Sequence, residues 1–182
     1  MINSRKELRD WKRSDEKYFK SFSRKVQLID KLTNSNLYII TKYIKKLRSE
    51  AYYFNKRSNL VCSLLYIWTR RKRMKLGTLL GFTMEPQSIG KGLIIEHFGC
   101  IVINGEAKLG ENCRLRGNNC IGMGSDGHSP HIGNNVDIGF GATIIGGITI
   151  ADDVKIAAGA VVVKSCMNVG ATLIGIPAKE VS

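Results

Sequence analysis

The fold is decided by residues 132–167, IGNNVDIGFGATIIGGITIADDVKIAAGAVVVKSCM, in which aliphatic residues recur every six positions. The recurring residues are Ile132, Ile138, Ile144, Ile150, Ile156 and Val162. A second series, four positions after each of these, is also small or apolar: Val136, Ala142, Ile148, Val154, Ala160 and Cys166. A helix would space its apolar residues three and four apart and a single strand would alternate, so neither explains this segment. A fixed short period indicates stacked, repeated turns of the chain instead.

Each six-residue unit can form one side of a three-sided coil. A short strand points its aliphatic residue inward, and a glycine or another small residue then allows a tight corner. Three units make a coil of about 18 residues, and such coils stack through backbone hydrogen bonds around a continuous apolar core. The segment therefore predicts a mainly β fold of stacked coils.

Composition divides the chain into two parts near residue 76. Residues 1–76 contain 21 Lys and Arg against 6 Asp and Glu, whereas residues 77–182 contain 7 against 9. All 19 glycines lie in the second part, between Gly77 and Gly175. We therefore predict two domains: a basic α-helical segment over residues 1–76, and a β domain with a C-terminal cap over residues 77–182.

Apolar residues recur at helical spacing in three stretches of the basic segment. We predict helices over residues 15–32, with Ser14 as N-cap, over residues 37–54 and over residues 59–75. Residues 77–86 are expected to link them to the β domain.

The positive charge of this segment has two interpretations. On the second predicted helix, Lys42, Lys45, Lys46 and Arg48 lie largely off the apolar face, as they would on a solvated surface. Alternatively, the charge attracts an anionic membrane surface or a phosphate-bearing acceptor. No nucleic-acid-binding motif accompanies it, so we expect no nucleic acid partner.

The sequence also carries expectations about location. The five cysteines show neither a CxxC motif nor zinc-like spacing, which indicates reduced thiols. The first residues lack the apolar core of a signal peptide, and the longest apolar run, residues 60–68, is too short to cross a bilayer. We expect a cytoplasmic protein, at most peripheral to the inner face of the membrane.

The six-residue period is interrupted at two places. A two-residue shift at residues 101–103 marks an altered corner of the coil. The spacing from Ile121 to Ile132 is eleven, which fits an excursion over residues 127–131 that leaves the column as a loop.

Three features of the chain resemble the hexapeptide-repeat acyltransferases, and within them the serine acetyltransferase branch. The repeats have the form Ile-Gly-x-x-Val-x, and IIEHFG at residues 94–99, followed by IVI, resembles the branch's catalytic-histidine motif. IGIPAK at residues 174–179 resembles the tail that lies beside bound coenzyme A. The resemblance implies a left-handed parallel β-helix, acetyl-CoA as acyl donor, no metal, and a homotrimer with its sites between neighbouring subunits.

The resemblance makes His97 the catalytic base. A neutral imidazole can take the proton of an alcohol that attacks a thioester, and can return it to the departing thiolate. In the branch an aspartate orients this histidine, but Thr83 stands at the matching position here. Glu85 is therefore the candidate for that role, with Glu96 as the alternative.

The other site residues are carried over from the resemblance in the same way. The loop residues expected to bind the acceptor are Asp126, His128 and His131, of which the histidines are also a second choice for the base. The loop reads His-Ser-Pro-His where a serine enzyme has Arg-His-Pro-Lys, and an ordinary exposed turn would explain it equally well. The residues expected to contact coenzyme A are Gly141, Ala142, Ala158, Gly159 and Lys179.

These observations predict an acetyl-CoA-dependent O-acetyltransferase. We expect the acceptor to be a sugar hydroxyl of an oligosaccharide in surface polysaccharide biosynthesis. The reasons are the missing aspartate, the altered loop, and a helical segment shorter and more basic than cysteine-pathway enzymes would carry. The alternatives are a serine O-acetyltransferase of cysteine biosynthesis and a non-catalytic β-helix scaffold.

Overall fold

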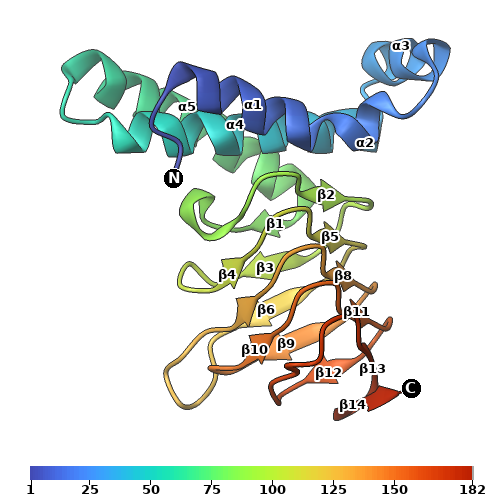
Figure 1. The fold of residues 1–182 in the computed structure, drawn as a ribbon. Coiled ribbons are helices and arrows are strands. Elements are labelled where there is room, and N and C mark those ends of the chain that lie inside the picture. Colours follow the sequence, from blue (N-terminus) through green and yellow to red (C-terminus); the bar gives the residue numbers. More distant parts are fainter. Residues whose placement is uncertain (182) are drawn as a thin grey trace. The chain divides into compact units, whose positions relative to one another are not determined.

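The computed structural model describes residues 1–181, and contacts divide the chain into two compact units, Met1–Leu80 and Gly81–Ser182. Helices make up the first unit and short strands the second (Figure 1). The last helix continues to Leu80, so Gly77 lies inside a helix. The predicted link beginning at residue 77 is therefore wrong. Among residues 1–181, no helix combines the length and the apolar character needed to cross a bilayer.

Serine caps mark the start of three of the helices of the first unit. The helices are α1 (Arg5–Asp15), α2 (Lys17–Lys20), α3 (Arg24–Thr33), α4 (Asn36–Asn55) and α5 (Leu60–Leu80). The hydroxyl groups of Ser4, Ser23 and Ser35 each accept a hydrogen bond from the backbone N–H three residues later. The predicted helix over residues 15–32 with Ser14 as its cap is wrong, because the chain starts a helix earlier, at Ser4, and restarts it at Ser23.

The core of the helical unit combines an apolar face with buried ion pairs. Ile40, Tyr43 and Leu47 of α4 are at most 1% exposed. Arg48, expected to lie off this face, is fully buried, and its Nε donates to Asp15 over 2.8 Å. The prediction for Arg48 was wrong because apolar spacing alone does not reveal a buried carboxylate partner.

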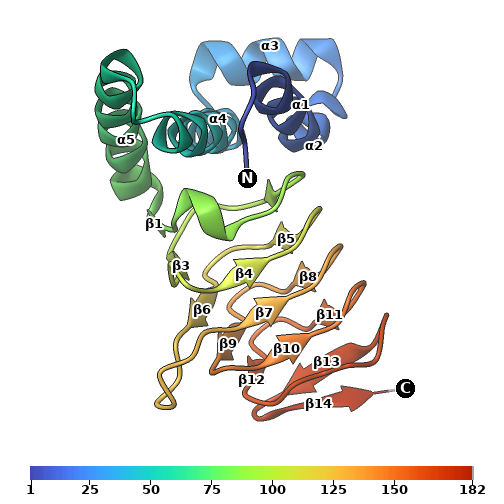
Figure 2. The ribbon, with the colours of Figure 1, turned by 60° about the vertical axis from the view of Figure 1, so that its left-hand side comes forward.

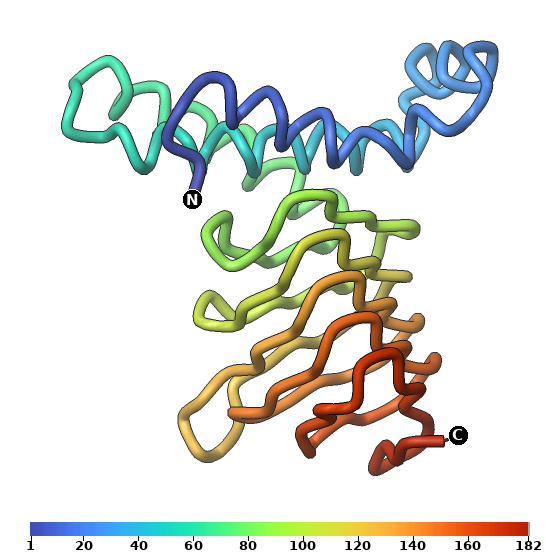
Figure 3. The backbone as a smooth tube through the Cα atoms, in the orientation of Figure 1, coloured from blue at the N-terminus to red at the C-terminus, as the bar shows by residue number. Residues whose placement is uncertain are grey.

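The second unit is a column of parallel coils (Figures 2 and 3). Its strands are β1 (Phe82–Thr83), β2 (Ile94–Ile95), β3 (Ile101–Ile103), β4 (Lys108–Leu109), β5 (Arg114–Leu115), β6 (Cys120–Gly122), β7 (His131–Ile132), β8 (Asp137–Ile138), β9 (Thr143–Ile145), β10 (Thr149–Ile150), β11 (Lys155–Ile156), β12 (Val161–Val162), β13 (Thr172–Gly175) and β14 (Ala178–Val181). They form three sheets, ordered β1-β3-β6-β9-β12, β10-β7-β4 and β14-β13-β11-β8-β5-β2.

The register places like residues on top of one another. Ile95, Leu115, Ile138 and Ile156 pair in succession, and each is at most 3% exposed. The aliphatic residues of the repeat therefore form one continuous ladder inside the column. The predicted parallel β-helix behind a helical segment is confirmed.

Two departures from the regular coil shape the surface of this unit. Ile95 pairs with Leu115 and Ile103 with Ile121, so the first corner contains two more residues than the corner below it. The loop between β6 and β7 spans residues 123–130, and His131 is already the first residue of β7. The predicted excursion over residues 127–131 therefore starts too late and ends one residue too far. At the far end, β13 and β14 pair antiparallel.

The buried thiol of Cys113 gives a first testable prediction. Burial raises the pKa of Cys113 from about 9 to about 11, and the thiol donates to the carbonyl oxygen of Gly133 over 3.2 Å. At pH 8 its thiolate fraction should be about a hundredfold smaller than that of an ordinary thiol. Alkylation followed by mass spectrometry should therefore label exposed Cys100 long before Cys113.

The same shift predicts the direction of a pH effect on stability. Because the pKa of Cys113 is higher in the folded state, its contribution is complete below about pH 9 and is lost as the pH rises through about 11. In the alkylation experiment, labelling of Cys113 as fast as Cys100 in the native protein would show that the Cys113 thiol is not buried with a raised pKa.

Candidate active site

His97 lies in the enlarged corner that follows β2, and it is exposed to solvent. On the coil below, Gly117 provides the space beside it. A Cβ atom on Gly117 would lie 3.2 Å from the His97 Cβ and 3.0 Å from the Phe140 Cε2, and its φ of 121° also disfavours a side chain. Because Gly117 has no side chain, His97 and Phe140 can both approach its Cα closely.

A buried asparagine fixes the backbone under this corner. Asn119 is 1% exposed; its Oδ1 accepts from the Gly117 N–H over 3.0 Å, and its Nδ2 donates to the Gly139 carbonyl over 2.7 Å. Asn119 therefore links the coil that carries Gly117, just below His97, to the coil that carries Gly139 and Phe140.

Charged side chains lie around this corner, but none of those described forms a hydrogen bond that would orient the His97 imidazole. Within residues 1–181, no hydrogen bond to the His97 ring is formed. Glu96 instead forms ion pairs with Arg114 and Arg116, each at 3.4 Å. Arg116 also donates two hydrogen bonds to Asp137, of 2.7 and 2.9 Å. The carboxylate of Glu96 is thus held by arginines.

Glu85, the other candidate to orient His97, lies beside Gly105 at the opposite end of β3. A Cβ atom on Gly105 would be 3.2 Å from the Glu85 Cγ. The structure therefore places Glu85 and His97 at different corners of the first coil.

A groove of about 360 Å³ runs along the outside of the next coils. Its lining residues are Arg116, Asp137, Gly139, Phe140, Lys155, Ile156, Ala157, Ala158 and Thr172. Its floor is made of small residues because the coils pack closely there: a Cβ atom on Gly139 would lie 2.4 Å from the backbone nitrogen of Ala158. Phe140 belongs both to this groove and to the surroundings of His97, so the two features are adjacent.

The residues predicted to contact coenzyme A are only partly gathered at this groove. Ala158 lines it, and Gly141 and Gly159 lie at the same corner with φ values of 72° and 67°. Ala142 is completely buried inside the column. Lys179 is exposed on β14 and is not among the lining residues.

The loop after β6 lies at another corner of the column. Asp126 accepts hydrogen bonds from the backbone N–H of His128, over 3.0 Å, and of Gly147, over 3.1 Å, and these lower the pKa of its carboxyl group. The His128 Nδ1 lies 2.7 Å from the Asp126 carbonyl oxygen, which can only accept, so in the neutral ring the tautomer with the proton on Nδ1 leaves the lone pair on Nε2.

Within one chain, the predicted base His97 therefore lies apart from the residues predicted to bind the acceptor. His97 lies before β3, Asp126 and His128 lie after β6, and His131 is an exposed residue of β7. Among residues 1–181, no group of three or more His, Cys, Asp or Glu side chains is arranged to hold a metal ion.

Sequence reasoning missed several residues of the groove. Phe140 offered a signal, because a large aromatic side chain that is 47% exposed follows directly after an inward isoleucine and a corner glycine. Asp137 and Lys155 each precede an inward isoleucine of the repeat, so their outward stacking could have been read from its period.

No protein-family description matches the chain, but individual sequences do. The serine acetyltransferase of Helicobacter pylori (strain ATCC 700392 / 26695) is 34% identical over 110 residues, which is 57% of this chain and 63% of that protein. The chain thus spans less than two thirds of this relative's length.

Solved structures give the same result over more of the chain. The Neisseria gonorrhoeae serine acetyltransferase in complex with serine is 25% identical, with a TM-score of 0.71 over 98% of this chain and 71% of that one. A serine acetyltransferase in complex with CoA has a TM-score of 0.73 at 22% identity, over 97% of this chain and 71% of that one, which is a likeness in fold.

Stacked hexapeptide coils with an exposed histidine at one corner define a hexapeptide-repeat protein. The relatives narrow this class, because the chain is similar to serine acetyltransferases. The resemblance read from the sequence is thereby confirmed, together with the left-handed β-helix that it implied.

Proposed function

We propose that the protein is an acetyl-CoA-dependent O-acetyltransferase with His97 as its general base. The observation that supports this is the exposed imidazole beside a groove that shares Phe140 with it. The imidazole takes the proton of an acceptor hydroxyl, whose oxygen then forms a bond to the thioester carbonyl carbon. As the tetrahedral intermediate collapses, the C–S bond breaks and the imidazolium returns the proton to the sulfur of CoA.

The groove has the properties expected of a binding site for the acyl donor. Its floor of Gly139, Ala157 and Ala158 lets an extended ligand approach the backbone closely. Arg116 and Lys155 supply positive charge at its edge for the phosphate groups of CoA.

For the acceptor, we propose L-serine as the first candidate. The relatives are serine acetyltransferases, which supports serine better than the sugar hydroxyl expected from the sequence. The helical segment does not exclude serine, because the fold of one serine acetyltransferase matches 98% of this chain, although only 71% of that enzyme is matched. A sugar hydroxyl is the second candidate, supported by Thr83 in place of an aspartate and by the altered sequence of the loop.

The proposal includes a homotrimer. His97 and the loop residues Asp126 and His128 lie at different corners of one column, so a site that uses both needs a neighbouring copy of the chain. Contact of the basic helical unit with an anionic membrane surface is a further part of the proposal, supported by its excess of Lys and Arg.

The proposed function is tested by the release of free CoA thiol from acetyl-CoA. We expect turnover with L-serine, and weaker or no turnover with nucleotide sugars and oligosaccharides. Turnover with a sugar acceptor and none with L-serine would reverse the order of the two acceptors. If acetyl-CoA does not bind, the protein is a scaffold and the enzymatic proposal fails.

A further inference from the structure

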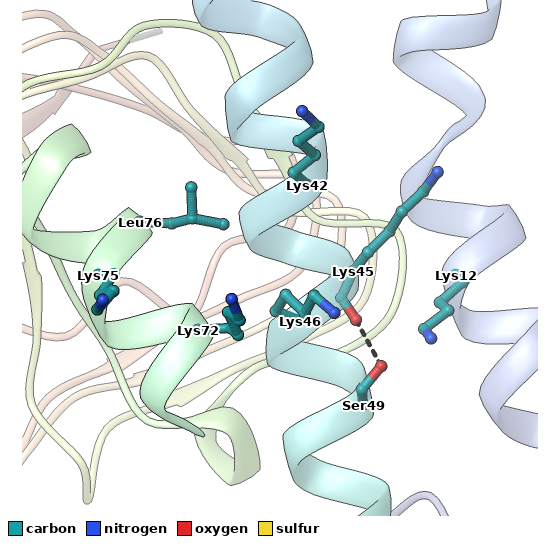
Figure 4. Close-up of a pocket in the computed structure, with 8 residues that line it drawn as sticks. All are labelled: Lys12, Lys42, Lys45, Lys46, Ser49, Lys72, Lys75 and Leu76. Carbon is teal, nitrogen blue, oxygen red and sulfur yellow. Dashed lines mark hydrogen bonds between the residues drawn. The ribbon is translucent and has the colours of Figure 1, made fainter. Parts of the chain in front are cut away.

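The helical unit contains a cavity lined almost entirely by lysines. The cavity has a volume of about 540 Å³ and lies among α1, α4 and α5 (Figure 4). Its lining residues are Lys12, Lys42, Lys45, Lys46, Ser49, Lys72, Lys75 and Leu76. Lysines from three different helices therefore face one space, whereas a solvated helix face would carry them on one element.

The carboxylates nearby are already engaged. Asp15 pairs with Arg48, Glu50 with Arg70 and Arg73, and Glu16 with Lys20 and Lys45. The ammonium groups of Lys12, Lys46, Lys72 and Lys75 form no salt bridge with a carboxylate in residues 1–181. The cavity thus keeps uncompensated positive charge.

The other polar contacts around the cavity leave these ammonium groups available. Lys42 donates to the Asn34 Oδ1 over 3.1 Å, and the Ser49 hydroxyl donates to the Lys45 carbonyl over 3.0 Å, as the dashed line in Figure 4 shows. The Lys46 ammonium lies 4.4 Å from the centre of the Trp68 ring, which holds its side chain in place without neutralising it.

The lowered pKa of Lys12 is a second sign of this excess of positive charge. Burial lowers the pKa of Lys12, and repulsion from Lys46 and Lys45 lowers it further, against a smaller opposing effect of Glu16. The folded unit therefore bears a cost for keeping these lysines charged around one cavity, and a bound anion would remove it.

We propose that this cavity binds a small anion carrying two or more phosphate groups. Its volume is that of a small-molecule site and exceeds what a single phosphate would fill. Several separate ammonium groups, spread over three helices, match charges that are spread along a polyphosphate. The lysine stems and Leu76 form apolar walls that can contact the rest of such a ligand. This site goes beyond the proposed function, because no step of acetyl transfer uses it.

The test is calorimetric titration of the 182-residue chain with inorganic tripolyphosphate, and with inorganic phosphate at matched ionic strength. We expect tripolyphosphate to bind at least about tenfold more tightly, because each additional charge-assisted hydrogen bond is worth about a factor of ten. Equal affinity for the two anions would overturn the proposal.

Two double variants separate the cavity from general charge. Lys12→Gln with Lys75→Gln removes two lining charges, and should weaken tripolyphosphate binding at least about tenfold without lowering the melting temperature of the ligand-free protein. Lys25→Gln with Lys31→Gln removes the same charge from exposed positions of α3 and should leave binding unchanged. Equal loss of binding in both variants would overturn the proposal.

A vesicle experiment distinguishes a free anion from a lipid headgroup. Vesicles of phosphatidylcholine and phosphatidylinositol bisphosphate are sedimented with the protein, with and without tripolyphosphate. Binding that tripolyphosphate displaces, and that only the Lys12/Lys75 variant loses, supports the cavity with a lipid headgroup as ligand. Tripolyphosphate binding without vesicle binding supports it with a free anion. Vesicle binding that both variants lose equally would overturn the assignment to this cavity.

Discussion

Replacing His97 by alanine should lower kcat for acetyl transfer by about 10²- to 10⁴-fold, the usual contribution of a general base. The affinity for acetyl-CoA should change little, because the groove is lined by other residues. Stability should also be preserved, because the imidazole is exposed and is not hydrogen-bonded within residues 1–181. The measurements are steady-state kinetics by CoA release, acetyl-CoA binding by calorimetry, and the pH profile of kcat/KM.

Two further measurements make the His97 experiment specific. Added imidazole should restore part of the activity of His97→Ala, and the acidic limb of the pH profile should disappear in the variant. Lys108→Ala, an exposed residue on a different sheet, is the control for surface substitution and should behave as the unchanged protein. If His97→Ala retains full activity and His128→Ala loses it, the base is His128, whose Nε2 lone pair is available in the loop.

The six-residue repeat was sufficient to predict the column because every inward position obeys one rule. Ile95, Ile138 and Ile156 all face the inside of the column and are at most 3% exposed, and Ile138 pairs in register with Ile156. Outward positions are not constrained in this way. Asp137 stacks on Arg114 in register but is hydrogen-bonded by Arg116, and the repeat does not specify this choice, so it became visible only in the structure.

The position of His97 was predictable, but its surroundings were not. The motif made His97 the candidate base, which stays a prediction, and the shift at residues 101–103 indicated an unusual corner. Gly117 and Phe140, which lie beside His97, belong to later coils and follow it by 20 or more residues in the chain. Sequence spacing gives no measure of such contacts, because they depend on how the extra residues of the corner bend.

The helical unit was harder to predict because its core is partly ionic. Arg48 and Arg73 are each at most 2% exposed, although charged residues are normally assigned to the surface. Burial alone would lower the pKa of Arg73, but the hydrogen bond with Glu50 and the attraction of Tyr43 and Glu50 outweigh it and raise that pKa above its ordinary value. Glu50 is therefore the carboxylate that compensates the buried charge of the Arg73 guanidinium group.

Replacing Glu50 by alanine should accordingly lower the free energy of unfolding of the helical unit by about 3–5 kcal/mol, because it leaves a buried charge without its partner. Glu50 is 1% exposed and accepts hydrogen bonds from Arg73 Nε and Nη2, at 2.5 and 3.2 Å, and from Arg70 at 3.2 Å. The measurement is denaturant unfolding followed by the helical circular-dichroism signal. A fluorescence probe attached to exposed Cys100 would follow the β unit separately.

A matched variant and a double variant identify the cause of this loss. Glu16→Ala removes a glutamate whose partners Lys20 and Lys45 are exposed, so it should cost no more than about 1 kcal/mol. Glu50→Leu combined with Arg73→Met removes both buried charges and should recover most of the stability, because no unpaired ion remains. If Glu50→Ala costs no more than Glu16→Ala, the ion pair does not hold α4 and α5 together. If the double variant is as unstable as Glu50→Ala, the loss comes from packing volume and not from the unpaired charge.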